Sequence, residues 1–196
     1  GSIWLTTYRG GLHQLSESKF KTFSTANGLE SDEISAIEEL GEDKYMIGSI
    51  DGKLAVIDHE KTIPLKIKTP INGRIYDILL DKFKNIWIAT RSGLLLMKPD
   101  GQQKFFTEKD GLPAGQLWVV TQDKKDNYWI GSRTGGMMKM DFIIYPDKPA
   151  FKEFKRQEIN SVFIMSIKET NQGDMIICTN TAGLNIISGD GKVNHY

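Results

Sequence analysis

The feature that most constrains the fold of this chain is a short pattern that recurs five times in 196 residues. Its clearest copy, Ile86–Met97, predicts two strands joined by a tight turn at Gly93. We call the second residue of each copy the anchor, and the anchors are Trp4, Met46, Trp87, Trp129 and Ile176. They follow one another at intervals of 42, 41, 42 and 47 residues. A period of this length is typical of repeat architectures.

Each unit contains short β-prone runs separated by residues that favour turns. The third unit shows this most clearly, with predicted strands at Ile75–Leu80, Ile86–Thr90, Leu94–Lys98 and Gln103–Phe106. Asp-Gly and Asn-Gly pairs recur between the runs, and both favour tight hairpins because Gly and Asn accept a positive φ. Helical periodicity is nearly absent. The chain is therefore predicted to be all-β.

The second and third strands of each unit are apolar on both faces, whereas a sheet with one wet face would alternate. Without helices, other copies of the same sheet must cover both faces. This predicts a β-propeller of four-stranded antiparallel blades rather than a β-sandwich, which would not keep a fixed register. We expect about five blades in one domain, the first lacking its innermost strand, with the approximate boundaries 2–24, 33–67, 74–107, 116–155 and 162–196.

We predict that the five anchors form structural core, because they lie in strands covered on both sides. The longer fourth interval is explained by an insertion at 142–147, which moves the equivalent of Phe106 to Phe154. Cys178 stands where the other units carry Thr6, Gly48, Ala89 and Gly131, so we expect a buried, inert thiol in a position that requires a small side chain.

Composition excludes several classes of function. Lysine plus arginine and aspartate plus glutamate both total 25, and this neutral balance argues against nucleic acid as a partner. A single cysteine excludes an internal disulfide framework. The three histidines, His13, His59 and His195, lie in different units without ligand spacing, so we expect no metal and no cofactor.

The units resemble the two-component regulator propeller repeat, in which an Ile-Trp-Ile-Gly-Thr strand precedes a Gly-Leu turn, an Asp-Gly hairpin and a Phe-Thr…Gly-Leu-Pro segment. The residues that carry the resemblance are Ile86–Thr90, Gly93–Leu94, Pro99–Gly101, Phe106–Thr107 and Asp110–Pro113, and again Phe23–Leu29. The match fades in the second unit, where Met46 replaces Trp, and in the fifth.

The resemblance implies the periplasmic sensor region of a hybrid two-component histidine kinase, or of a protein with a cyclase output. Such a region lies outside the cytoplasm and is linked to transmembrane and kinase segments. Family members have seven or fourteen repeats, so this chain is either a fragment of a larger propeller, able to pair as a homodimer through exposed blade faces, or a small closed ring.

If the chain runs outward through each blade, the turn between the second and third strands lies on the same side as the connection to the next blade. Loop rims of this kind commonly bind ligands. Arginines there would suit carboxylate or sulfate groups on a sugar. The predicted ligand-binding residues are Tyr8, Arg9, Arg91, Arg133, Thr134 and Asn180 on the rim, together with Trp118 on an inner strand.

No catalytic motif is present, and the repetition itself argues against an asymmetric catalytic set. The sequence therefore favours a non-enzymatic sensor that binds an oligosaccharide or a similar ligand. Two alternatives stay open: a structural or protein-interaction propeller that mediates dimerisation, and a lyase or hydrolase propeller.

Overall fold

The computed structural model describes residues 3–7, 9–16, 19–113, 116–141, 150–154 and 156–196. They form five antiparallel sheets, the first with three strands and the others with four. No helix within these ranges has the length and apolar character needed to cross a membrane.

In every sheet, strands that follow one another in the chain are hydrogen-bonded neighbours, so each sheet is a simple meander. We call the sheets blades 1 to 5, because such sheets stacked face to face are the blades of a β-propeller. Blade 1 contains β1 (Ile3–Thr7), β2 (Gly11–Ser16) and β3 (Lys19–Phe23). Blade 2 contains β4 (Ile34–Gly41), β5 (Lys44–Ser49), β6 (Leu54–Asp58) and β7 (Lys61–Pro64).

Blades 3 to 5 repeat the four-strand plan. Blade 3 contains β8 (Ile75–Leu80), β9 (Ile86–Thr90), β10 (Leu94–Met97) and β11 (Gln103–Phe106). Blade 4 contains β12 (Leu117–Gln122), β13 (Tyr128–Ser132), β14 (Met137–Asp141) and β15 (Ala150–Phe154). Blade 5 contains β16 (Ile164–Glu169), β17 (Met175–Thr179), β18 (Leu184–Ile187) and β19 (Val193–His195). The short helices are η1 (Thr25–Asn27), η2 (Glu108–Asp110) and α1 (Arg156–Ile159).

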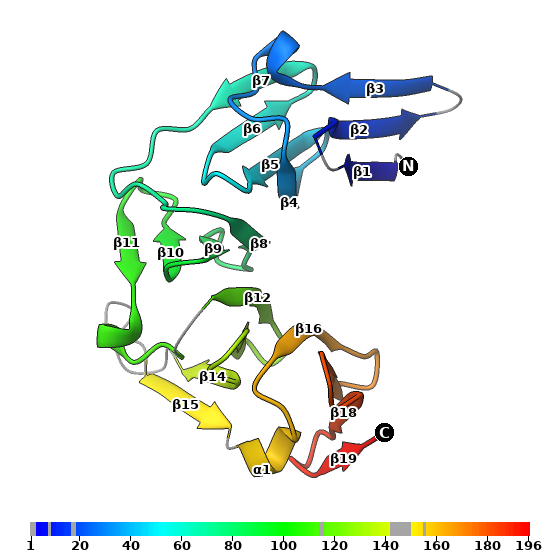
Figure 1. Ribbon diagram of the computed structural model, residues 1–196, viewed down its shortest axis with the longest axis vertical. Coiled ribbons are helices and arrows are strands. Elements are labelled where there is room, and N and C mark those ends of the chain that lie inside the picture. Colours follow the sequence, from blue (N-terminus) through cyan, green and yellow to red (C-terminus); the bar gives the residue numbers. More distant parts are fainter. Residues whose placement is uncertain (1–2, 8, 17–18, 114–115, 142–149, 155) are drawn as a thin grey trace.

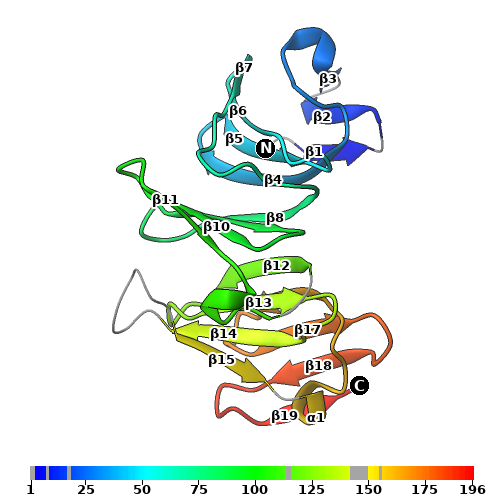
Figure 2. The same ribbon diagram turned by 60° about the vertical axis from the view of Figure 1, so that its left-hand side comes forward.

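The five blades form an open arc (Figure 1), with β4, β8, β12 and β16 toward its concave side. Figure 2 shows the same sheets stacked one upon another along the chain. This confirms the predicted fold class, an all-β propeller whose first blade lacks its innermost strand. Several predicted strands, such as Ile75–Leu80 and Ile86–Thr90, have the same bounds in the structure.

The anchors hold neighbouring blades together. Each anchor of blades 1 to 4 packs against the following blade. Trp4 packs on a cluster that includes Ile47 of blade 2, and Met46 lies in one cluster with Ile88 of blade 3. Trp87 packs on the first strand of blade 4, and Trp129 packs on the first strand of blade 5. Met46, Trp87 and Trp129 are buried, and Trp4 is partly buried. The hydrophobic core is therefore divided into four layers between blades.

Blade 5 departs from the prediction. Ile176 is only partly buried, and Cys178 is exposed rather than buried. Both occupy positions that face a following blade in the other units, and the described residues form no further sheet after blade 5. The position of Cys178 does require a small side chain inside the stack: a Cβ atom added to Gly131 would lie 2.5 Å from Ile164 Cγ2.

An acidic turn that precedes an anchor strand helps to hold the anchor in place. Asp81 is buried and accepts hydrogen bonds from the backbone nitrogens of Phe83 and Asn85, both at 2.8 Å. Its Oδ2 also accepts from Trp87 Nε1 at 2.9 Å and from the Tyr128 hydroxyl of blade 4 at 2.6 Å. The same carboxylate therefore forms the turn, fixes the anchor and ties two blades.

In the fourth unit, Phe154 pairs with Met137 in the register in which Phe106 pairs with Leu94. The equivalence predicted across the insertion is thus confirmed. The insertion itself, at 142–147, lies outside the described residues.

Candidate functional site

Backbone hydrogen bonds define one rim of the arc. The turn between the second and third strands of a blade bonds to the segment that precedes its first strand: Arg91 N to Arg74 O at 2.9 Å, Arg133 N to Gln116 O at 2.9 Å, and Asn180 N to Phe163 O at 3.1 Å. Gly136 N also donates to Val162 O at 2.9 Å, in the connection to blade 5. The predicted placement of these turns beside the blade connections is confirmed.

A hydroxyl group at the end of each second strand stabilises these turns. In blade 3, Thr90 Oγ1 donates to Gly93 O at 2.7 Å and accepts from Ser92 N and Gly93 N. In blade 4, Ser132 Oγ accepts from Gly135 N at 2.7 Å. The residues just after the hydroxyl, which include the rim arginines, are thereby held on a rigid turn rather than on a loose loop.

A pocket opens in the rim between blades 4 and 5, and we call it the rim hollow. The lining residues are Arg133, Thr134, Asn160, Ser161, Val162, Phe163, Asn180 and Thr181. The hollow is open to solvent and has a volume of about 410 Å³, within the range of roughly 300–1,000 Å³ typical of ligand sites. Asn160 adopts a left-handed backbone conformation with φ of 58°, which asparagine accepts more readily than most other residues.

The rim hollow carries one positive charge and no carboxylate among its lining residues. The Arg133 guanidinium lies 5.8 Å from the centre of the Phe163 ring, a cation–π contact that orients it. Arg133 is exposed, and the described residues offer it no ion-pair partner. An oriented guanidinium without a counterion is suited to bind a carboxylate, sulfate or phosphate group.

An aromatic row runs from the hollow toward the concave side of the arc. Phe163 contacts Trp118 edge-on at 4.9 Å between ring centres, and Trp118 stacks on Tyr76 at 5.2 Å. The Arg74 guanidinium lies 5.4 Å from the Tyr76 ring centre. The three aromatic rings thus contact mainly one another and the two guanidinium groups. A ligand in the hollow would therefore meet chiefly polar and charged groups.

Beside this row, two carboxyl groups link the first strands of blades 2, 3 and 4. Asp77 Oδ2 accepts from Val120 N at 3.0 Å, and Glu38 Oε1 accepts from Leu80 N at 2.7 Å. Burial raises the pKa of Asp77 to about 7, against the lowering effect of its two backbone hydrogen bonds, and the nearby charge of Glu38 adds to the rise. Burial also raises the pKa of Glu38.

The structure brings together some of the predicted site residues and separates others. The rim hollow is lined by Arg133, Thr134 and Asn180 among the predicted residues. Trp118 does not line it but contacts Phe163, which does. Arg9 instead forms an ion pair with Glu33 at 3.2 Å. Arg91 lies on the equivalent turn of blade 3 and does not line the hollow. Tyr8 lies outside the described residues.

Sequence reasoning missed the half of the site that comes from the blade connection, chiefly Asn160, Ser161 and Phe163. It also missed Arg74 and Tyr76 at the start of β8. A usable signal existed: each predicted rim turn must face the residues just before a first strand, and Arg74 and Phe163 occupy that place in their blades.

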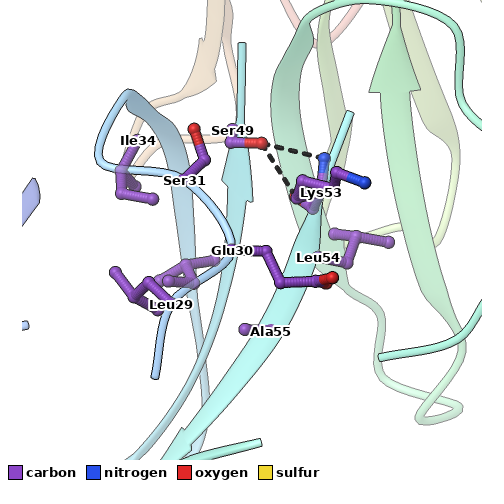
Figure 3. A pocket seen from close by; sticks show the side chains of 9 residues that line it. Leu29, Glu30, Ser31, Ile34, Ser49, Lys53, Leu54 and Ala55 are labelled. Carbon is purple, nitrogen blue, oxygen red and sulfur yellow. Dashed lines mark hydrogen bonds between the residues drawn. The ribbon is translucent and has the colours of Figure 1, made fainter. Parts of the chain in front are cut away.

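The other hollows offer less. Figure 3 shows one beside the turn of blade 2, where Lys53 N donates to Ser49 Oγ at 2.8 Å. Its volume of about 10 Å³ is enough for roughly one water molecule. The described part of the chain contains no group of three or more His, Cys, Asp or Glu side chains that could hold a metal ion.

Comparison with protein families finds one match: residues 69–92, around β8 and β9, match the model of the two component regulator propeller. The chain thus carries a repeat of this kind, as the resemblance implied. Comparison with curated proteins gives no match.

Several solved structures share the fold. The extracellular domain of the putative hybrid two component system BT3049 from B. thetaiotaomicron matches 95% of this chain with a TM-score of 0.76 at 21% identity. PorZ, a surface component of the type-IX secretion system of Porphyromonas gingivalis, matches 95% with a TM-score of 0.71 at 14% identity. Virginiamycin B lyase from Staphylococcus aureus matches all of it with a TM-score of 0.77 at 13% identity.

This chain spans 25% of the length of the BT3049 chain, 30% of the PorZ chain and 66% of the lyase chain. It is thus equivalent to a fraction of those propeller chains. The similarity joins an extracellular domain of a putative two-component system, a component of a secretion system and an enzyme, so the fold alone does not decide the function.

Proposed function

We propose that this chain is a ligand-binding propeller from the extracytoplasmic sensor region of a two-component signalling protein, and that the rim hollow is its binding site. The observation that carries the proposal is Arg133, held on a rigid turn and stacked on Phe163 in a hollow without carboxylates. The matching repeat at 69–92 and the similarity to BT3049 support the sensor class.

The ligand that fits this lining is an oligosaccharide, or a similar polar molecule, with an acidic group. Arg133 would bind the acidic group through two parallel hydrogen bonds. The side chains of Asn180, Thr134 and Asn160 carry the donors and acceptors that hydroxyl groups need. A sensor also requires two states with different affinity for the ligand. Contacts between blades 4 and 5 are the natural place for such a change, because both blades line the hollow.

Catalysis is the less favoured function. The lining of the rim hollow includes no histidine, cysteine, aspartate or glutamate. Its hydroxyl groups, such as that of Ser161, therefore have none of these side chains in the lining to act as the general base that a hydroxyl nucleophile needs. Dimerisation without a small ligand is favoured by a different observation. Ile3 and Leu5 on blade 1 and Met165 on blade 5 are exposed at 59%, 46% and 43%, and exposed apolar side chains of this kind favour association.

A thermal-shift screen against matched neutral and acidic oligosaccharides tests the proposal. A ligand at 100 times its dissociation constant adds about 2.7 kcal/mol, which raises the melting temperature by roughly 5–10 °C for a chain of this size. We expect acidic members to produce the shift, Arg133→Ala to abolish it and Lys125→Ala, at an exposed turn on the opposite edge, to preserve it. Sedimentation velocity separates the alternative: a stable dimer with no shift from any sugar would favour the interaction function.

A further inference from the structure

Arg74 is a second oriented guanidinium on the rim. It directly precedes β8, and its backbone oxygen accepts from Arg91 N at 2.9 Å, in the rim turn of blade 3. Its guanidinium lies 5.4 Å from the centre of the Tyr76 ring, and the residue is exposed. The described part of the chain offers it no ion-pair partner. Arg74 thus shares the features that suit Arg133 to bind an anion, although it lies outside the lining of the rim hollow.

The aromatic row joins Arg74 to Arg133. Tyr76 lies in β8, Trp118 lies in β12, and Phe163 directly precedes β16. These three strands follow one another along the concave side of the arc (Figure 1). Tyr76 stacks on Trp118 at 5.2 Å, and Trp118 meets Phe163 edge-on at 4.9 Å, between ring centres. Each guanidinium lies against one end ring, so the two positive charges are held at opposite ends of a row of three rings.

A hydrogen bond between blades 3 and 4 fixes the row, and no carboxylate neutralises it. The Tyr76 hydroxyl donates to Gln116 Oε1 at 2.6 Å. Gln116 directly precedes β12, as Arg74 precedes β8. In blade 2 the same place holds Glu33, which forms an ion pair with Arg9 at 3.2 Å. The row across blades 3 to 5 therefore carries two guanidinium groups where the rim of blade 2 carries a neutralised pair.

We propose that Arg74 is a second anion-binding position for the ligand of the rim hollow, and that this ligand is a linear oligosaccharide with acidic groups on more than one sugar unit. The inference rests on the proposed function, because it takes the rim hollow as the binding site. One acidic group binds Arg133, the sugar chain follows the rim toward blade 3, and a further acidic group binds Arg74. Two contacts in one molecule raise the affinity only when that molecule spans both positions, so the length and the charge of the sugar set its affinity.

The test is isothermal titration calorimetry of the whole chain, at fixed ionic strength, with three uronic acid oligosaccharides. They are a disaccharide, a hexasaccharide with every carboxylate free, and a hexasaccharide with one free carboxylate and the others methyl-esterified. We expect the fully charged hexasaccharide to bind about tenfold or more tightly than the other two, since a second hydrogen-bonded contact to a charged group is worth that much. Arg74→Ala should remove this advantage and leave the affinity for the disaccharide unchanged, whereas Arg133→Ala should weaken the binding of all three.

Arg91→Ala is the matched control, because Arg91 is also an exposed arginine on the rim of blade 3, and it should keep the advantage. Arg74→Gln is a second variant, and the melting temperature without ligand shows whether each variant is folded. Equal affinities of the three sugars, or an advantage that survives Arg74→Ala, would overturn this inference and leave the proposed function standing if Arg133→Ala still weakens binding. Equal losses from Arg74→Ala and Arg91→Ala would also overturn it, because the gain would then reflect general charge attraction. Binding that does not depend on Arg133 would overturn the proposed function as well.

Discussion

Asp77 makes the stability of this fold depend on pH in an unusual direction. Its carboxyl group accepts backbone hydrogen bonds from Ile78 and Val120 and lies near Glu38. Burial raises its pKa to about 7, whereas the unfolded value is about 3.9. At a pH between these two pKa values, Asp77 is protonated in the folded state and ionised in the unfolded state. The contribution of Asp77 to stability is therefore fully present below about pH 4 and is lost as the pH rises toward 7 and above.

The size of the effect follows from the two pKa values. Between pH 5 and pH 8, the linkage relation gives a loss of roughly 2–3 kcal/mol in the free energy of unfolding from Asp77. Asp77→Asn keeps the shape and one acceptor oxygen but cannot ionise. The difference in free energy of unfolding between the variant and the wild type should therefore shift by roughly 2–3 kcal/mol in favour of the variant from pH 5 to pH 8. This shift is expected whether the variant is more or less stable than the wild type at pH 5.

Urea denaturation at pH 5 and pH 8 measures this difference, with Glu39→Gln as the control because Glu39 is exposed on the neighbouring strand β4. A wild type and an Asp77→Asn variant whose stabilities change in parallel with pH would refute the reasoning. A variant whose free energy of unfolding falls relative to the wild type as the pH rises would also refute it, because the buried carboxylate would then be stabilising.

Three further predictions concern the packing between blades. Asp81→Ala removes the acceptor of the Trp87 indole and of the Tyr128 hydroxyl. It should lower the free energy of unfolding, measured by urea denaturation, by about 3 kcal/mol. A loss under about 1 kcal/mol would be too small for two buried donors left without an acceptor. Gly131→Ala should cost about 1–3 kcal/mol by overpacking, whereas Gly189→Ala, which meets nothing within 4 Å, should be neutral in the same assay; equal effects would contradict the packing. Cys178 is exposed, so a thiol reagent should label it in the native protein, and protection until unfolding would show that the outer side of blade 5 is covered.

The interior of the fold was predictable because position within the repeat determines the environment. Met46, Trp87 and Trp129 each lie between two blades, and the period alone placed them in equivalent registers. The same logic failed for Ile176 and Cys178. Their sequence context is that of an internal blade, yet burial depends on a following blade that the described residues do not include.

The site was only half predictable. The repeat indicated which turns share a rim, and this placed Arg133 and Asn180 correctly beside the blade connections. It could not distinguish Arg133 from Arg9, because the difference is a tertiary contact: Glu33 neutralises Arg9, and Phe163 orients Arg133. Both partners occupy the same place in the repeat, directly before a first strand. The residue type at that place changes from blade to blade, so the period indicates where the partner lies but not whether it neutralises or orients the arginine.

The most direct test is the affinity of the chain for the acidic oligosaccharide that gives the largest thermal shift, measured by isothermal titration calorimetry at fixed ionic strength. Recognition through the rim hollow predicts that Arg133→Ala weakens binding at least tenfold, since a bidentate charged contact is worth more than about 1.4 kcal/mol, while Lys125→Ala leaves it unchanged. Equal affinities of the wild type and Arg133→Ala would contradict it.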